Sequence, residues 1–118
     1  VVLQTKKNKF YLTEKNDLIN FKNFKEYKDL PYVIGNKEEF KIFYHNLKKM
    51  NFPTRLIKKY TLYELNRWDL ETANKEIIKL PHKNYISSLK RYLEMQNKSG
   101  FKKYKIFDFR IKDQLILK

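Results

Sequence analysis

The chain has 118 residues, of which 42% are hydrophobic and 16% aromatic, enough apolar material for one folded domain with a single core. Nine Phe, nine Tyr and only three Pro argue against a disordered chain. The absence of cysteine excludes disulfides, thiolate metal sites and cysteine nucleophiles. No apolar stretch approaches the ~20 residues that span a bilayer. The chain begins with Val1 and shows no signal peptide, so we interpret it as a fragment of a longer protein.

The net charge of +14 at first suggests nucleic acid or anionic lipid as a partner. However, only four of the 27 basic residues are arginines, and the arginine fork is the group that favours base readout and bidentate phosphate binding. The lysines are scattered and accompany Asn, Ile, Phe and Tyr, whose codons are rich in A and T. We therefore favour a solvated basic surface, and keep as an alternative a single-stranded nucleic-acid-binding module that stacks bases on lysine-flanked aromatics at Lys58-Lys59-Tyr60 or Lys102-Lys103-Tyr104.

The first third of the chain predicts short strands. Apolar groups at 2–3, 10–12 and 18–19 alternate with turn-type residues such as Lys15-Asn16-Asp17, which is typical of hairpins. Residues 21–29 repeat an aromatic every third position without a cap, and we predict a loop there. Residues 30–34 read as a short extended segment.

The clearest helix begins after Asn36. Its side chain can accept a hydrogen bond from the amide of Glu39, and the Glu39 side chain can reach back in a capping box. Apolar side chains then recur at spacings of three and four, which places on one face Phe40, Phe43, Tyr44, Leu47 and Met50. Phe52-Pro53 ends this helix.

The rest of the chain predicts a strand at 56–65, a hairpin with arms at 67–72 and 76–80, a second helix and a final hairpin. Asn84 is predicted to cap the second helix, whose inner face holds Ile86, Leu89, Tyr92 and Leu93 and whose Lys90-Arg91 pair faces water. The final hairpin uses 104–111 and 115–117. The short links predict an α+β fold: a mostly antiparallel sheet with two helices packed on one face, ending in a C-terminal β-hairpin with an exposed edge strand.

Catalytic and cofactor motifs are missing from the sequence. His45 and His82 lack a second ligand at metal-binding spacing, and with only Gly35 and Gly100 there is no glycine-rich phosphate loop. The serines at 87, 88 and 99 stand outside any nucleophile-elbow context. We therefore expect no enzyme activity, no cofactor and no metal.

Three motifs resemble a known family. Residues 66–81, Asn-Arg-Trp-Asp-Leu-Glu-Thr-Ala-Asn-Lys-Glu-Ile-Ile-Lys-Leu-Pro, resemble the Arg-Trp-x-Leu hairpin of the bacterial cell-division protein family FtsQ, called DivIB in Gram-positive species. Residues 106–111, Ile-Phe-Asp-Phe-Arg-Ile, are similar to its Asp-Leu-Arg strand, with Phe109 in place of Leu. Residues 30–35, Leu-Pro-Tyr-Val-Ile-Gly, are similar to the segment before its first helix.

The resemblance implies a single-pass protein of the bacterial inner membrane, with a POTRA domain followed by a periplasmic β domain. Residues 1–8 would be the end of the upstream POTRA domain and 9–118 the FtsQ-type β domain, anchored by a membrane segment absent from this fragment. The implied role is non-enzymatic: binding the divisome proteins FtsB and FtsL during septum formation, without a small-molecule substrate.

The resemblance also implies a binding surface, formed by the last strand and the Asp-x-Arg strand before it: Arg110, Ile111, Gln114, Leu115, Ile116 and Leu117. A terminal strand at a sheet edge offers unpaired N–H and C=O groups to an incoming strand. The alternative is that Leu115-Ile116-Leu117 only completes the core. If the edge binds, Ile116→Pro, which removes an amide donor from that strand, or deletion of residues 115–118 is expected to weaken partner binding more than folding.

Overall fold

The structure is a computed structural model that describes residues 2–4, 9–12, 18–20, 30–112 and 114–118. Side chains are described for 2–4 and from residue 30 onward, Asp113 excepted. The predicted loop at 21–29, the turn at Lys15-Asn16-Asp17 and Asp113 lie outside the described residues.

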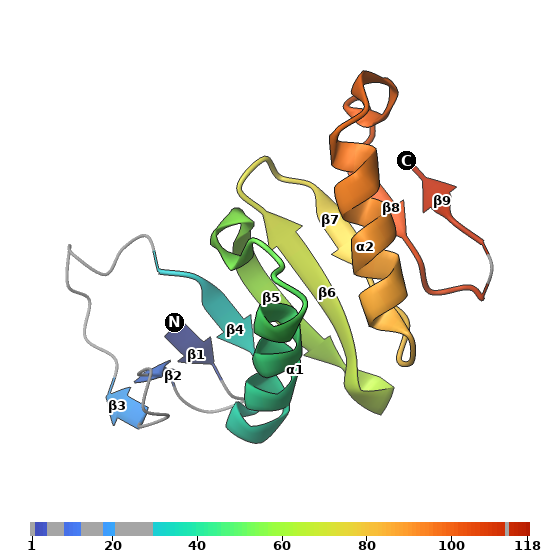
Figure 1. Cartoon of the computed structure of the whole chain (residues 1–118). Coiled ribbons are helices and arrows are strands. Elements are labelled where there is room, and N and C mark those ends of the chain that lie inside the picture. Colours follow the sequence, from blue (N-terminus) through green and yellow to red (C-terminus); the bar gives the residue numbers. More distant parts are fainter. Residues whose placement is uncertain (1, 5–8, 13–17, 21–29, 113) are drawn as a thin grey trace.

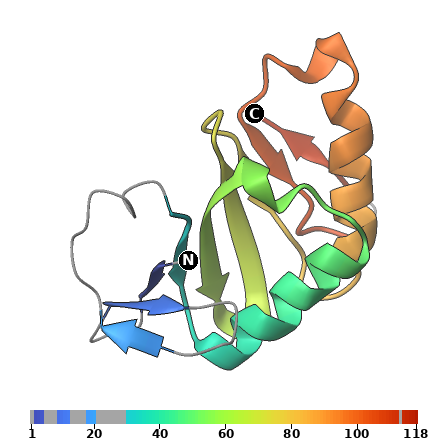
Figure 2. The same ribbon diagram turned by 60° about the vertical axis from the view of Figure 1, so that its left-hand side comes forward.

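The described strands form one sheet in the spatial order β3-β2-β1-β4-β5-β6-β7-β8-β9 (Figure 1). Their bounds are β1 Val2–Gln4, β2 Lys9–Leu12, β3 Leu18–Asn20, β4 Tyr32–Ile34, β5 Ile57–Tyr63, β6 Arg67–Thr72, β7 Ile77–Lys79, β8 Ile106–Asp108 and β9 Ile116–Leu117. In the described sheet, five of the eight pairs of neighbouring strands are antiparallel, which confirms the predicted mostly antiparallel sheet. β3 and β9 lie at opposite ends of this sheet (Figure 2).

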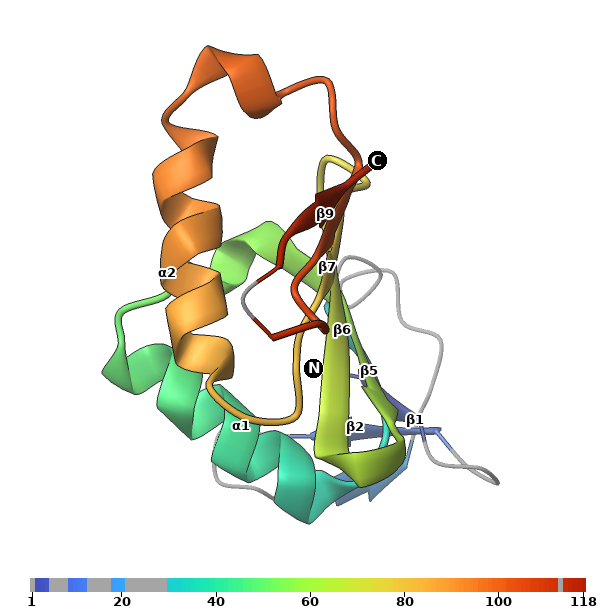
Figure 3. The same ribbon diagram turned by 90° about the vertical axis from the view of Figure 1, so that its right-hand side faces the viewer.

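Two helices, α1 Lys37–Lys49 and α2 Tyr85–Gln96, cover one face of the sheet (Figure 3). Short 3₁₀ turns complete the chain as η2 Thr54–Leu56, η3 Glu64–Asn66 and η4 Ser99–Phe101. The strand pairs that flank each helix, β4 with β5 and β7 with β8, are parallel. A helix returns the chain to the end of the sheet where the preceding strand began, so the next strand runs the same way. The argument from short links did not foresee these parallel pairs.

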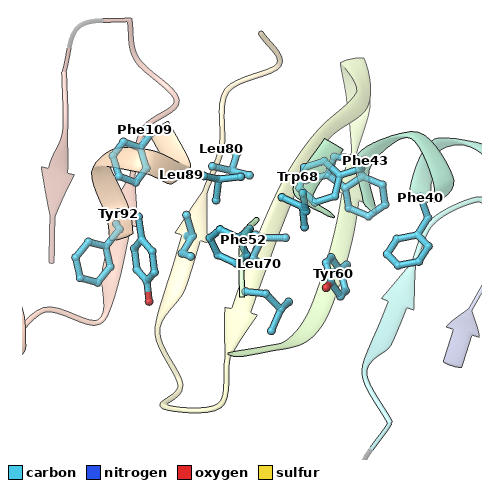
Figure 4. Packing of buried hydrophobic residues seen from close by; sticks show 14 of the residues in the cluster. Phe40, Phe43, Phe52, Tyr60, Trp68, Leu70, Leu80, Leu89, Tyr92 and Phe109 are labelled. Carbon is cyan, nitrogen blue, oxygen red and sulfur yellow. The ribbon is translucent and has the colours of Figure 1, made fainter. Parts of the chain in front are cut away.

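Aromatic rings fill the layer between helices and sheet (Figure 4). Phe43 stacks on Trp68 with ring centroids 5.0 Å apart, and Phe40 meets Tyr60 edge to face at 5.1 Å. These four side chains expose between 1% and 3% of their surface. The prediction that the aromatics of the first helix and Trp68 belong to the core is confirmed.

Gly35 allows the hairpin of β5 and β6 to pack closely against the start of α1. A Cβ on Gly35 would lie 2.9 Å from Leu62 Cβ and 3.5 Å from the Trp68 ring. The Asn36 half of the predicted capping box is present, because Asn36 Oδ1 accepts a hydrogen bond of 2.8 Å from the Glu39 amide. The glycine of the 30–35 motif is therefore explained by packing.

The prediction that the Asn84 side chain caps α2 is wrong. Asn84 does precede the helix, but its backbone is left-handed, with φ 62°, and its side chain makes no capping hydrogen bond. An N-cap residue normally has an extended backbone, which directs the side chain at the first amides. Lys90 and Arg91 are exposed, as predicted.

A buried polar cluster links α2 to the turn between β6 and β7. The Tyr92 hydroxyl donates to Glu76 Oε1 at 2.6 Å, and the Glu76 amide donates to Thr72 Oγ1 at 3.1 Å. All three residues are buried. Burial, together with the hydrogen bond to Glu76, raises the pKa of Tyr92 well above its usual value. The phenol therefore remains a donor, and α2 is held in place above β7 and β8.

Candidate interaction edge at the last strand

The six residues predicted to bind a partner lie along one border of the sheet. Arg110 and Ile111 follow β8, and the Ile111 side chain is 50% exposed. Gln114 is exposed, and its amide donates to the Ile111 carbonyl at 3.1 Å in the turn before β9. Leu115, Ile116 and Leu117 are each partly buried. The structure thus gathers them on one border; that this border binds a partner stays a prediction.

The backbone of β9 has one side turned to β8 and one turned outward. Lys118 exchanges two hydrogen bonds with Ile106, of 3.0 and 3.1 Å, and Leu117 lies opposite Phe107. In an antiparallel pair such hydrogen-bonded residues alternate with residues whose N–H and C=O point away from the neighbouring strand. Ile116 and Lys118 therefore face β8, whereas Leu117 directs its N–H and C=O to the outer edge of β9.

This register corrects one expectation. Proline at 116 would remove an amide that faces β8, so it would disturb the fold and not the outer edge. The outward amide belongs to Leu117, because neighbouring residues of a strand direct their N–H groups to opposite sides. The sequence alone could not show which residues of the strand direct their N–H groups toward β8.

The side chains of β9 also divide between two faces. Leu115 and Leu117 pack against the hydrophobic core under α2, where Tyr92 meets Phe107 edge to face at 5.2 Å. Ile116 points to the opposite face, next to Asp108 in the register. Leu115, Ile116 and Leu117 are each partly buried, so the leucines complete the core and also line the outer edge.

Asp108, the first residue of the Asp-x-Arg motif, belongs to this border but was not among the six predicted binding residues. Its carboxylate binds the Arg110 guanidinium through two bonds, Nε to Oδ1 at 2.9 Å and Nη2 to Oδ2 at 2.7 Å, and also accepts the Arg110 amide at 3.0 Å. These hydrogen bonds from Arg110, with the charge of Lys79 on β7, hold the pKa of Asp108 below its usual range. The i, i+2 spacing in a strand was the available signal, because it places both residues on one face.

Bidentate pairing fixes the direction of Arg110. The ion pair also fixes the direction of the backbone where it leaves β8 and enters the turn before β9. The Arg110 side chain remains 44% exposed in the ion pair, so it still presents charge to solvent.

The two tyrosines that the nucleic-acid alternative uses for base stacking differ in their exposure. Tyr60 is 1% exposed and packs against Phe40, so it offers no ring to a base, and that part of the alternative is wrong. Tyr104 is partly exposed, and Lys103 Nζ lies 5.2 Å from its ring centroid.

His45 and His82 are exposed. Among the described residues, no three His, Cys, Asp or Glu side chains gather where they could hold a metal ion. In the same part of the chain, neither helix has the length and apolar character needed to cross a membrane.

The fold and the border define a small α+β domain whose sheet ends in a short, partly apolar strand paired on one side within the described residues. A family model described as "Cell division protein FtsQ/DivIB, C-terminal" matches residues 1–110. The chain therefore belongs to the FtsQ/DivIB family of cell-division proteins. No curated protein matches the chain.

The family match ends at Arg110. Ile111, Gln114 and the whole of β9 lie beyond it, although β9 completes the sheet through its pairing with β8. The case for this border therefore depends on its geometry.

Proposed function

We propose that this chain is the periplasmic β domain of a non-enzymatic divisome scaffold of the bacterial inner membrane, and that it binds FtsB and FtsL through β9 during septum formation. The observation that carries the proposal is the outward N–H and C=O of Leu117 at the end of the sheet. An incoming strand can pair with them and continue the sheet.

The side chains around this backbone support the same binding mode. Leu115, Ile116 and Leu117 are only partly buried and Ile111 is half-exposed, so a docked strand would cover apolar surface on both faces of the sheet. β9 contributes only two residues, and main-chain bonds alone would therefore give weak affinity. Burial of these side chains and charge contacts with Arg110 would supply the rest.

The domain organisation follows the same proposal. Residues 1–8 would connect to an upstream POTRA domain, and a membrane segment further upstream would anchor the protein. β1 nevertheless pairs with β4 in the sheet, and Leu3 is 1% exposed in the core. The proposed POTRA domain would therefore connect directly to a buried strand of the β domain. This connection would fix the orientation of the two domains relative to each other.

The experiment is a calorimetric titration of the domain with the periplasmic segments of FtsB and FtsL from the same organism, at low and moderate salt. We expect saturable binding that persists at moderate salt and disappears on deletion of residues 115–118. Because Leu115 and Leu117 contact the core, circular dichroism and thermal unfolding of the deletion variant must show that it is folded.

Two results would contradict the proposal. One is full binding by the folded deletion variant, which would exclude β9 as the docking strand. The other is no binding of FtsB or FtsL together with salt-sensitive retention of single-stranded nucleic acid, which would favour the lysine-flanked Tyr104 as a stacking site.

A further inference from the structure

Six lysines gather at one end of the molecule, around the end of α2 and the last residue of β9. They come from the turn between β6 and β7, from the segment between α2 and β8, and from the residue after β9, and we call them the lysine end: Lys75, Lys98, Lys102, Lys103, Lys105 and Lys118. All six are exposed. In Figure 1 the three segments lie in the upper half of the view, with the β6–β7 turn to the left of η4 and of the C-terminus, and in Figure 3 the turn lies next to the C-terminus.

Hydrogen bonds bring these segments together. The Lys105 amide donates to the Lys118 carbonyl at 2.7 Å, and Lys105 Nζ donates to the Asn74 carbonyl at 3.4 Å. The Ile77 amide donates to the Lys105 carbonyl at 2.7 Å, which joins the β6–β7 turn to the same place. The lysines at 98, 102 and 103 lie on the short turns around η4 that lead into Lys105. The cluster is therefore a property of the fold.

The lysine end has little compensating charge. The stretches 73–75, 97–106 and 114–118 contain no Asp or Glu. The nearest acid after the β6–β7 turn, Glu76, is 5% exposed and bonded to Tyr92, so its charge is turned inward. Glu94, in the last turn of α2, is exposed and offsets one of the six positive charges. The positive potential of the six ammonium groups consequently extends into solvent over about a Debye length, ~8–10 Å at physiological salt.

The lysine end continues directly into the outer edge of β9. Lys118 is the residue after Leu117, whose N–H and C=O form that edge, and Lys105 is bonded to Lys118 from the neighbouring strand segment. A strand that docks on Leu117 would therefore pass beside Lys118 at one end, and beside the apolar pair Leu115 and Ile116 toward the other.

We propose that the partner segment carries a cluster of acidic residues at the end that lies beside Lys118, and that the lysine end attracts and orients it before the strand pairs with β9. The inference rests on the proposed function for the docking strand and adds the charge pattern of the partner. Electrostatic complementarity of this kind acts mainly on the association rate and on register, and salt weakens it.

The first test compares two variants of equal charge change. Lys102→Glu with Lys118→Glu alters the lysine end, whereas Lys41→Glu with Lys83→Glu alters exposed lysines on α1 and before α2. Stopped-flow association with the FtsB and FtsL segments should be about tenfold slower for the first variant at low salt, and nearly unchanged for the control. Equal slowing of both variants, or an association rate of the wild type that does not depend on salt, would overturn the inference.

A second test needs neither FtsB nor FtsL, so it separates failure of the inference from failure of the proposed function. A polyglutamate peptide is titrated into the isotopically labelled domain, and amide chemical shifts are followed. Shifts concentrated at 73–75, 98–105 and 118 are expected. Shifts of equal size over the lysines of α1 would show that the peptide senses only net charge, and would refute a specific acidic-segment site even if FtsB and FtsL bind elsewhere on the chain.

Discussion

The two amides of β9 give the sharpest prediction, because neighbouring residues should respond in opposite ways to proline. Ile116→Pro removes an N–H that faces β8 and orphans its acceptor. A buried carbonyl that loses its only donor costs about 1–3 kcal/mol, a cost that already includes the lost hydrogen bond, so the free energy of unfolding should fall by about 1–3 kcal/mol. Leu117→Pro removes an outward N–H, which an edge strand tolerates.

The matched control is Leu117→Ala, which shortens the same side chain but keeps the amide. In urea titrations Leu117→Pro and Leu117→Ala should differ from each other by less than about 1 kcal/mol. In calorimetric titrations with FtsB and FtsL, Leu117→Pro should bind roughly 5- to 150-fold more weakly than Leu117→Ala, because one hydrogen bond is lost and one acceptor of the partner is left without a donor.

Two outcomes would refute the reasoning. Equal affinities of Leu117→Pro and Leu117→Ala would mean that no strand pairs with the outward amide. A larger loss of stability in Leu117→Pro than in Ile116→Pro would mean that the Leu117 amide, and not the Ile116 amide, faces β8.

Two further predictions concern the core. Gly35→Ala should lower the free energy of unfolding by about 1–3 kcal/mol, because the new Cβ would lie 2.9 Å from Leu62 Cβ. Gly100→Ala, with no atom within 4 Å of its new Cβ, should be neutral or slightly stabilising. Chemical denaturation that found Gly100→Ala less stable than Gly35→Ala would contradict this packing. Burial raises the pKa of Tyr60 and of Tyr92 above the ordinary value of 10.0, so above pH 10 the folded state keeps two protons that the unfolded state releases. The free energy of unfolding should therefore decrease as pH rises above 10, by up to about 2.7 kcal/mol per pH unit. Tyr92→Phe should halve that slope in denaturation curves measured around pH 10, and an unchanged slope would show that Tyr92 does not contribute.

Local sequence was informative wherever a single element carried the signal. The spacing of Phe40, Phe43 and Leu47 predicted the buried face of α1, and Asn36 with Glu39 marked its start, because both patterns depend on residues within one or two helical turns. The hairpin of β6 and β7 was predicted for a similar reason. Asn84 shows the limit of this approach: its side chain could have capped α2, but the left-handed turn that carries the chain from β7 into the helix directs it elsewhere.

The sequence by itself determined the class of fold, the core-facing residues of α1 and, through three motifs in the correct order, the family to which the chain belongs. For α2 it found Leu89 and Tyr92 but not the buried Ser88 and Met95. Tertiary structure alone decided the parallel pairs β4–β5 and β7–β8, the outward direction of the Leu117 amide and the gathering of distant lysines around Lys118. The physical reason is that strand register and the meeting of separate segments arise from hydrogen bonds between residues far apart in the chain. Local periodicity specifies which face of an element is apolar, but not which neighbour that element meets.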